Sequence, residues 1–238
     1  MENNVNEIVP EQEYLTTRDL STGTIKSSIE TRIERLESML YKINVCETDI
    51  QKSGDRTNLP QFAHDTDVGL DMYPSCVTLE SYMGNEYRFD ISDDAGVTLE
   101  LIKQAESEEK QKYSFFKRIV RFLKGKEWRL GWKRLKFDTG IAVAPDDFYF
   151  YYGAPNSRVV KTDVILQNSV GIIDPTYRGT IRFMYRNFEN GFITDTVKTL
   201  CNCCGQIFPT IRVKPSIKFV DKLSVTERGT GGFGSSSK

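Results

Sequence analysis

The sequence predicts an all-β fold, a barrel or a sandwich, to which helical segments have been added. Short runs rich in β-branched and aromatic residues recur from Phe137 onward, with turn residues between them, at 140–145, 147–152, 158–166, 180–185 and 211–220. A matching run lies earlier, at 68–81. The chain of 238 residues and 27.3 kDa has room for one domain, or for a smaller domain that carries extra segments.

The composition excludes several classes of protein. The 32 basic and 33 acidic residues give a formal net charge of −1, so the chain as a whole does not attract nucleic acid or an anionic membrane. No apolar run approaches the roughly 18 residues of a membrane span. The acidic N-terminus lacks the apolar region of a secretory signal. We therefore expect a protein that has no membrane span, is not secreted and works in the cytoplasm or the nucleus.

Histidine and cysteine limit the chemistry that the chain can perform. His64 is the single histidine, which excludes metal sites with several histidines and argues against a catalytic triad that uses histidine. Five cysteines, an odd number in a chain without a signal, indicate reduced thiols. The C-x-C-C group at 201–204 would need a distant fourth ligand to bind zinc, so we interpret it as thiols. Catalysis would then depend on carboxylates or on a borrowed metal.

Residues 1–60 form an N-terminal helical extension and a linker in front of the core. Helical spacing predicts a helix with one apolar seam, made of Ile25, Ile29, Ile33, Leu36, Leu40 and Ile43. Such a seam either docks on its own domain or pairs with a helix of another copy. The segment 52–60, KSGDRTNLP, is typical of a linker.

The β core is expected over 61–225, with a largely helical insertion at about 90–136. Within this insertion, the segment 110–136 contains eleven basic residues, a single acid and six interleaved aromatic residues. One interpretation is a surface for nucleic acid or a protein partner, where cations meet phosphates and rings stack on bases. The other is an amphipathic helix whose rings pack on the domain while its cations reach water.

Three places in the core carry polar side chains that could take part in chemistry. Asp174 follows an apolar run and precedes a Pro-Thr turn, so its carboxylate could hold a water as general base or could simply begin the turn. Asp71 alternates with apolar neighbours, where a buried acid needs hydrogen-bond donors or a hydrated cation. Ser157 and Arg158 lie in a loop before a strand-like run, as donors to phosphate.

The C-terminus, 226–238, is predicted to be a flexible glycine-rich lid. Its sequence, TERGTGGFGSSSK, places several glycines around Arg228 and Phe233. Glycines let successive backbone N–H groups approach phosphate oxygens, and the arginine adds a fixed cation. Phe233 could close over a planar base. A disordered Gly/Ser tail is the simpler interpretation of the same residues.

Taken together, these motifs resemble those of the trimeric dUTPase family. The segment VGLDM at 68–72 resembles the family's first motif, AGxDL; NSVGIIDPTYRG at 168–179 resembles the third, GxxDxxYRG; and RGTGGFGSS at 228–236 is close to the fifth, RGxGGFGSTG. The resemblance covers about 61–89 and 137–238. It implies a jelly-roll-like β-barrel core, hydrolysis of dUTP to dUMP and pyrophosphate with Mg²⁺, and a homotrimer whose active sites each draw on three subunits.

The resemblance also implies a role for each matched residue. Asp174 would activate a water for attack on the α-phosphorus, Tyr177 would lie under the deoxyribose and exclude a 2′-hydroxyl, and Asp71 would hold Mg²⁺ through a water. Asn168 and backbone groups near Gly171 and Ile173 would read the uracil edge. The phosphates and the closing tail would involve Ser157, Arg158, Arg228, Gly231, Gly232, Phe233, Gly234 and Ser235.

Two motifs depart from the family pattern. The second is usually PRSG or PRSS, whereas this chain has Asn156 at the arginine position. The fourth, GxRIxQ, has Pro209 where the glutamine should fall. These departures favour an alternative, a catalytically weakened dUTPase-like protein that binds nucleotide and a partner. A dCTP deaminase, of similar fold, is disfavoured because Met184 stands where that enzyme has a catalytic glutamate.

Overall fold

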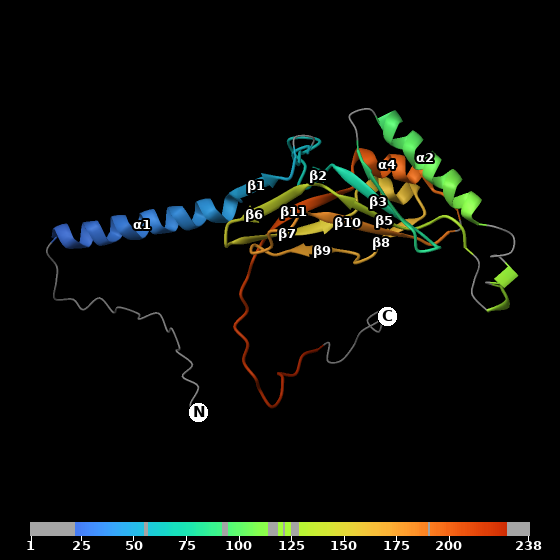
Figure 1. The fold of residues 1–238 in the computed structure, drawn as a ribbon. Helices are drawn as coiled ribbons and strands as arrows, with labels where there is room; N and C mark the ends of the chain where they lie inside the picture. The colour runs from blue at the N-terminus through green and yellow to red at the C-terminus, as the bar shows by residue number, and fades with distance from the viewer. Residues whose placement is uncertain are drawn as a thin grey trace, which may run out of the picture.

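The computed structural model describes residues 22–54, 57–91, 95–113, 119–120, 122–124, 129–189 and 191–227. Its body is built from antiparallel strands that form two larger sheets and one strand pair (Figure 1). Helices lie at the two ends of this body, so the structure confirms the all-β, jelly-roll-like class with helical additions.

The five-stranded sheet has the order β4-β3-β5-β10-β8. These strands are β4 (Glu86–Asp90), β3 (Cys76–Ser81), β5 (Trp132–Asp138), β10 (Arg182–Asn187) and β8 (Val164–Leu166). The four-stranded sheet has the order β2-β11-β7-β9. Its strands are β2 (Leu70–Met72), β11 (Gly205–Ile211), β7 (Tyr149–Ala154) and β9 (Gly171–Ile173). A separate pair joins β1 (Thr48–Lys52) to β6 (Ile141–Pro145).

The core lies between the inward faces of the sheets. Burial alternates along β10, where Phe183 and Tyr185 point inward and their neighbours outward, as a strand with one solvated face requires. Trp132, Leu135 and Phe137 of β5 are fully buried. Each such side chain contributes about 1.5–3 kcal/mol on burial, so the alternation of the sequence is what stabilises the two-sheet arrangement.

The helices α1 (Thr22–Asn44), α2 (Ala95–Lys112) and α4 (Thr194–Asn202) and the 3₁₀ turn η1 (Ser157–Lys161) accompany the strands in the part of the chain that the structure describes. α1 extends away from the body, and α2 and α4 lie at the opposite end (Figure 1). The hydroxyl of Thr194 on α4 donates to the carboxylate of Glu106 on α2 over 2.5 Å, which joins the two helices. The 3₁₀ turn η1 connects β7 to β8. No helix of the described residues is both long and apolar enough to cross a membrane.

Several predicted runs lie where the sequence places them. The predicted helix is α1. The runs at 68–81 and 140–145 contain β2 with β3 and β6, and the runs at 147–152 and 180–185 overlap β7 and β10. Two runs differ. Residues 158–161 form η1 because the side chain of Asn156 caps a 3₁₀ turn there. The N–H of Arg212 donates to the carbonyl of Phe148 over 2.6 Å, but residues 213–220 form no strand, because a strand requires hydrogen-bonded neighbours and no described residue pairs with them.

Two predicted boundaries also need correction. β1 lies within residues 1–60, so β structure begins before the position 61 that the sequence pattern suggests. The insertion ends before Trp132, because 132–136 belong to β5 in the middle of the larger sheet. The basic stretch 110–136 is therefore not one amphipathic helix. The side chains of Lys133 and Arg134 form ion pairs with Glu80 of the neighbouring strand instead.

Candidate active site

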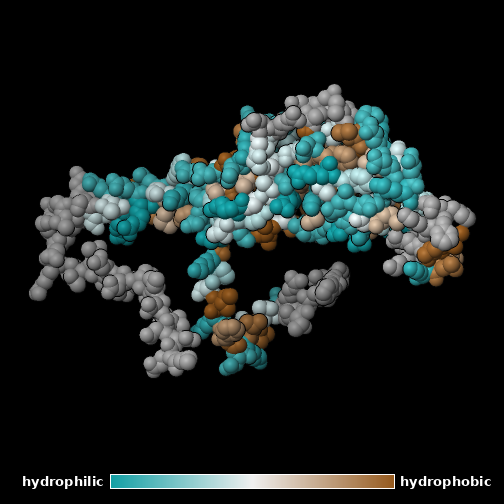
Figure 2. All heavy atoms as spheres, in the orientation of Figure 1, coloured by the Kyte–Doolittle hydropathy of each residue, from teal (hydrophilic) through white to brown (hydrophobic). Residues whose placement is uncertain are grey.

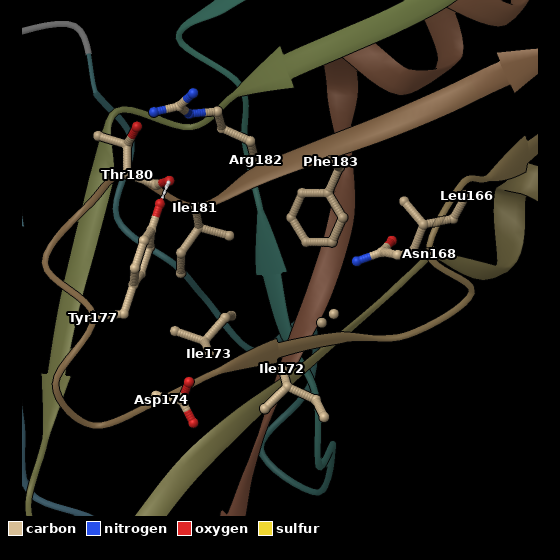
Figure 3. A pocket seen from close by; sticks show the side chains of 12 residues that line it. Leu166, Asn168, Ile172, Ile173, Asp174, Tyr177, Thr180, Ile181, Arg182 and Phe183 are labelled. Atoms are coloured by element: carbon tan, nitrogen blue, oxygen red, sulfur yellow. Dashed lines mark hydrogen bonds between the residues drawn. The ribbon is translucent and has the colours of Figure 1, made fainter.

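A pocket of about 280 Å³ opens where the two larger sheets end (Figure 3). β8 is the last strand of one sheet and β9 the last of the other, so residues of both sheets form its wall. The lining residues are Gly153, Leu166, Asn168, Gly171, Ile172, Ile173, Asp174, Tyr177, Thr180, Ile181, Arg182 and Phe183. Five of the residues that the third motif singles out therefore meet in one hollow.

The turn between β8 and β9 shapes one end of the pocket. Its residues cross from one sheet to the other, because β8 pairs with β10 whereas β9 pairs with β7. The backbone N–H of Gln167 donates to the carbonyl of Met184 over 2.9 Å, and Ser169 adopts φ 58° to turn the chain. A Cβ at Gly171 would lie 3.4 Å from Nδ2 of Asn168, so a glycine keeps this end open.

Asp174 and Tyr177 lie in the turn that follows β9. The N–H of Tyr177 donates to the carbonyl of Asp174 over 3.0 Å, and its hydroxyl donates to the carbonyl of Thr180 over 3.2 Å, which fixes the ring along the pocket wall (Figure 3). A Cβ at Gly179 would collide with the Tyr177 phenol. The carboxylate of Asp174 is exposed, and no described residue donates a hydrogen bond to it.

The sequence analysis missed several lining residues, among them Thr180, Arg182 and Phe183. Thr180 donates to Oδ2 of Asp138 over 3.0 Å, and Nε of Arg182 lies 3.3 Å from the same oxygen, so Asp138 holds this side of the pocket. The ring of Phe183 is 2% exposed and lies in the pocket floor. A Cβ at Gly205 would collide with that ring. No local motif reports these contacts, because they join strands that are distant in sequence.

Asp71 lies in a second group of polar residues, on β2. It is 8% exposed, and its Oδ1 accepts hydrogen bonds from Nδ2 of Asn156 at 3.2 Å and Nε2 of Gln206 at 2.7 Å. Gln206 is opposite Asp71 in the register of β2 and β11. The departure in the second motif therefore has a structural role, since Asn156 holds Asp71 and also accepts from the N–H of Arg158 at 3.0 Å.

Arg158 and Ser157 lie near this group, at the start of η1. Burial raises the pKa of Tyr73, the charges of Asp71 and Cys203 raise it further and Arg158 lowers it, so both Asp71 and Arg158 act on the same hydroxyl. The side chains of Ser157 and Arg158 are exposed. A negatively charged ligand near Asp71 could therefore reach an arginine and a hydroxyl without any rearrangement of the core.

The two groups of residues are separate within one chain. β2 and β9 are the two edges of the four-stranded sheet, and β11 and β7 lie between them. The pocket and Asp71 are therefore not brought together by this chain alone. The remaining predicted site residues, Arg228, Gly231, Gly232, Phe233, Gly234 and Ser235, lie outside the described residues.

The cysteines and the basic stretch contribute no further site among the described residues. Burial raises the pKa of Cys201 to about 12, and Cys203 and Cys204 are buried. In the part of the chain that the structure describes, no three or more His, Cys, Asp or Glu residues gather as metal ligands. In the basic stretch, Trp132 is a core residue, whereas Phe122 is 79% exposed.

Comparison with known proteins gives relatives of one kind. The deoxyuridine 5′-triphosphate nucleotidohydrolase of Escherichia phage T5 is 36% identical over 104 residues, which are 44% of this chain and 69% of that protein. The enzyme of the same name from Bdellovibrio bacteriovorus is 29% identical over 107 residues, 44% of this chain and 70% of that protein. A solved structure of the Staphylococcus bacteriophage 80alpha dUTPase shares 16% identity at a TM-score of 0.47, covering 81% of this chain and 99% of that one. No family model matches.

Proposed function

This chain belongs to the deoxyuridine 5′-triphosphate nucleotidohydrolase (dUTPase) family, and from this premise we propose that it hydrolyses dUTP to dUMP and pyrophosphate. It is thus an enzyme of the dUTP diphosphatase class. The observation that carries the proposal is the pocket in which Asn168, Asp174 and Tyr177 meet. Its volume of about 280 Å³ suits part of a nucleotide better than a whole nucleoside triphosphate.

Asn168 and Tyr177 are proposed to select the base and the sugar. The amide of Asn168 has both donors and an acceptor, as the edge of uracil does. Tyr177 is 42% exposed and held by its bond to Thr180, so its ring offers a fixed flat surface to a deoxyribose. A 2′-hydroxyl on that sugar would meet the ring, which accounts for selection against ribonucleotides.

Asp174 is proposed as the general base that takes a proton from the attacking water. Its carboxylate accepts no hydrogen bond from any described residue, so both oxygens are available to orient a water. The water attacks the α-phosphorus, the bond to the bridging oxygen breaks and pyrophosphate leaves. Catalysis of this kind depends on position and charge rather than on covalent chemistry, so a chain with one histidine can perform it.

Asp71 fits the role of a magnesium ligand. Mg²⁺ binds in proteins through one or two carboxylates together with substrate phosphates and water, and Asp71 supplies one carboxylate beside Ser157 and Arg158. Asn156 and Gln206 fix its Oδ1. A bound Mg²⁺ would neutralise charge on the triphosphate. Arg158 is proposed to supply the cation that the second motif lacks at position 156.

A homotrimer with shared active sites is proposed because a single chain keeps Asp71 and the pocket apart. The segment 212–227 supports it. This segment leaves the body, and its apolar side chains are exposed (Figure 2), including Val213, Ile217, Phe219, Leu223 and Val225. Exposed apolar side chains of this number are typical of a segment that packs on another subunit. In such an assembly the tail at 226–238 could close over a neighbour's pocket.

Pyrophosphate release from dUTP with Mg²⁺ tests the proposed reaction. Assays with dCTP, dTTP and UTP run beside it as specificity controls. We expect release from dUTP alone, because Tyr177 and Asn168 select the sugar and the base. Equal release from UTP would contradict the role of Tyr177, and no release from any of the four nucleotides would contradict the reaction.

The Asp174→Asn variant tests the base. Asparagine keeps the size of the side chain but cannot take a proton from water, so turnover should fall by about 10²–10⁴-fold while dUTP still binds. Asp147→Asn, at another turn residue outside the pocket, is the matched control and should keep full turnover. Retained turnover in Asp174→Asn would refute its role as the base.

A weakened, nucleotide-binding member of the family is the second candidate. The observation that favours it is Asn156, whose side chain is committed to Asp71 and to the N–H of Arg158. Measurements of dUTP binding and of pyrophosphate release together distinguish the enzyme from the binding protein. A folded protein that binds dUTP but releases no pyrophosphate would support the binding protein, whereas release supports the enzyme.

A further inference from the structure

The helix α1 presents an apolar seam whose described side chains, Ile29, Ile33, Leu36 and Leu40, are exposed. Ile29 and Ile33 are 50% and 48% exposed, and Leu36 and Leu40 are 59% and 58% exposed. All side chains from Ser28 to Lys42 are exposed, and α1 projects away from the body (Figure 1). Of the two arrangements that the sequence leaves open, the structure therefore excludes docking on its own described domain.

Among the described side chains, the contacts between α1 and the residues that follow it lie beyond the exposed part of the seam, Ile29 to Leu40. The ammonium of Lys42 is 5.5 Å from the centre of the Phe148 ring, and the hydroxyl of Tyr41 donates to Glu47 over 3.2 Å. Both residues are in the last turn. These contacts orient the end of the helix and leave the seam available to another molecule.

We propose that α1 packs along this seam with α1 of other copies of this chain, as a parallel coiled coil. The spacing supplies the seam: in a heptad abcdefg, Ile33 and Leu40 occupy a and Ile29, Leu36 and Ile43 occupy d. A single helix without tertiary packing is only marginally stable in water, and burial of a continuous a/d row is the usual source of its stability.

The charges beside the seam fit a parallel pairing. Arg32 is at position g and Glu37 is at the e position of the next heptad, so each Arg32 faces a Glu37 across a parallel pair. In an antiparallel pair e faces e, and Glu30 and Glu37 would meet only acids. Within its own helix, Arg32 has no acidic residue three or four positions away. Glu37 likewise has no basic residue three or four positions away. Their complementary partners are on the neighbouring helix.

The residues at d favour three helices over two. Two-stranded parallel coiled coils prefer leucine at d, whereas isoleucine at d shifts the preference to trimers and tetramers. Isoleucine occupies two of the three d positions here. Three helices is also the number in the trimer of the proposed function, but the pairing itself rests on the seam and its charges and not on the enzyme's activity.

Disulfide trapping in the full-length protein tests the pairing. A cysteine at d faces its own copy in a parallel coiled coil, so Ile29→Cys should crosslink most chains on mild oxidation, whereas an antiparallel pair would hold the two residues apart. Ser28→Cys, one position away on the outer face, is the matched control. It should crosslink no more than the wild type, whose Cys46 sets the background. No crosslink in Ile29→Cys, or an equal one in Ser28→Cys, would overturn the proposal.

A charge exchange provides the second arm of the test. In the Ile29→Cys background, Arg32→Glu places acids opposite Glu37 and should slow crosslinking. Addition of Glu37→Arg restores the opposite charges and should recover it. Slow crosslinking in the double exchange would contradict parallel g–e pairing. None of these measurements uses turnover, so an inactive enzyme with crosslinked helices would refute the proposed function alone.

Discussion

The carboxylate of Asp71 is held in place by hydrogen bonds from two neighbouring side chains, without any ligand. At 8% exposure, a carboxylate needs partners, and it has Asn156 and Gln206. Both side-chain amides donate their hydrogen bonds to the same oxygen, Oδ1 of Asp71. A hydrogen bond to a charged group contributes about 1.5–3 kcal/mol, so these two amides determine how well Asp71 is held.

Gln206→Ala should weaken the binding of Mg²⁺ more than it lowers the stability of the fold. Loss of the 2.7 Å hydrogen bond frees the carboxylate to rotate, so the Mg²⁺ concentration needed for half-maximal turnover should rise. Titration of turnover with Mg²⁺ measures it, beside thermal unfolding without metal. Gln51→Ala, on the exposed strand β1, should leave both measurements unchanged. An unchanged magnesium titration in Gln206→Ala would contradict a role for Gln206 in the magnesium site.

Gly179→Ala should act on substrate binding rather than on folding. The new Cβ would collide with the Tyr177 phenol, and that ring can move because it is 42% exposed. We expect a raised KM for dUTP, weaker discrimination against UTP and a nearly unchanged Tm. Gly54→Ala is a suitable control, since a Cβ at Gly54 meets no atom within 4 Å. A Tm that falls as far as activity would show that the collision disturbs the fold instead.

At the scale of elements, α2 is attached to the sheet through a buried carboxylate. Glu109 is 0% exposed and accepts hydrogen bonds from Nδ2 of Asn85 at 2.9 Å and the hydroxyl of Tyr87 at 2.8 Å. Burial acts to raise the pKa of Glu109, but the hydrogen bonds from Ser81, Asn85 and Tyr87 outweigh it, and the pKa lies below its ordinary value. The charged form therefore stabilises the folded protein.

The stabilisation from Glu109 should disappear in acid. Because its folded pKa lies below the ordinary value of 4.5, the stabilisation is complete above that pH and is lost as the pH falls through the folded pKa. Glu109→Gln should lower Tm at neutral pH, and its difference from the wild type should shrink below pH 4.5. Glu108→Gln changes an exposed neighbour and should show neither effect. A difference that is constant with pH would mean that size, not charge, matters at this position.

Elements whose pattern is local were predictable, and those whose pattern is not local were missed. The β-branched and aromatic composition of β3, β7 and β10 and the helical spacing in α1 appear directly in the sequence. β1 (TDIQK) has no such composition, and four of its five residues are exposed. Residues 213–220 have strand-like composition but no neighbouring strand among the described residues, so composition alone misleads there.

At the scale of the molecule, the same distinction separates the parts of the site. The structure brings the third-motif residues Asn168, Asp174 and Tyr177 to one pocket, because they lie within ten residues of each other in the two turns that flank β9. The contact between Asp71 and Gln206, and the position of Phe183 in the floor of the pocket, depend on how strands distant in sequence are paired in the sheets. In the proposed trimer, Asp71 of one copy would meet the pocket of another, and the pattern of a single sequence does not specify such a contact.

Two truncations separate assembly from closure of the site. A chain ending at 227 keeps the apolar segment and loses only the glycine-rich tail, so it should remain a trimer, keep its Tm and lose most turnover, because Arg228 and Phe233 are gone. A chain ending at 212 also loses Ile217, Phe219 and Leu223, whose exposed surfaces have no use in a monomer. Light scattering should then show a smaller particle. A chain ending at 212 that stays trimeric would assign assembly to the sheets and α1 instead, and a melted chain ending at 227 would refute the tail as a lid.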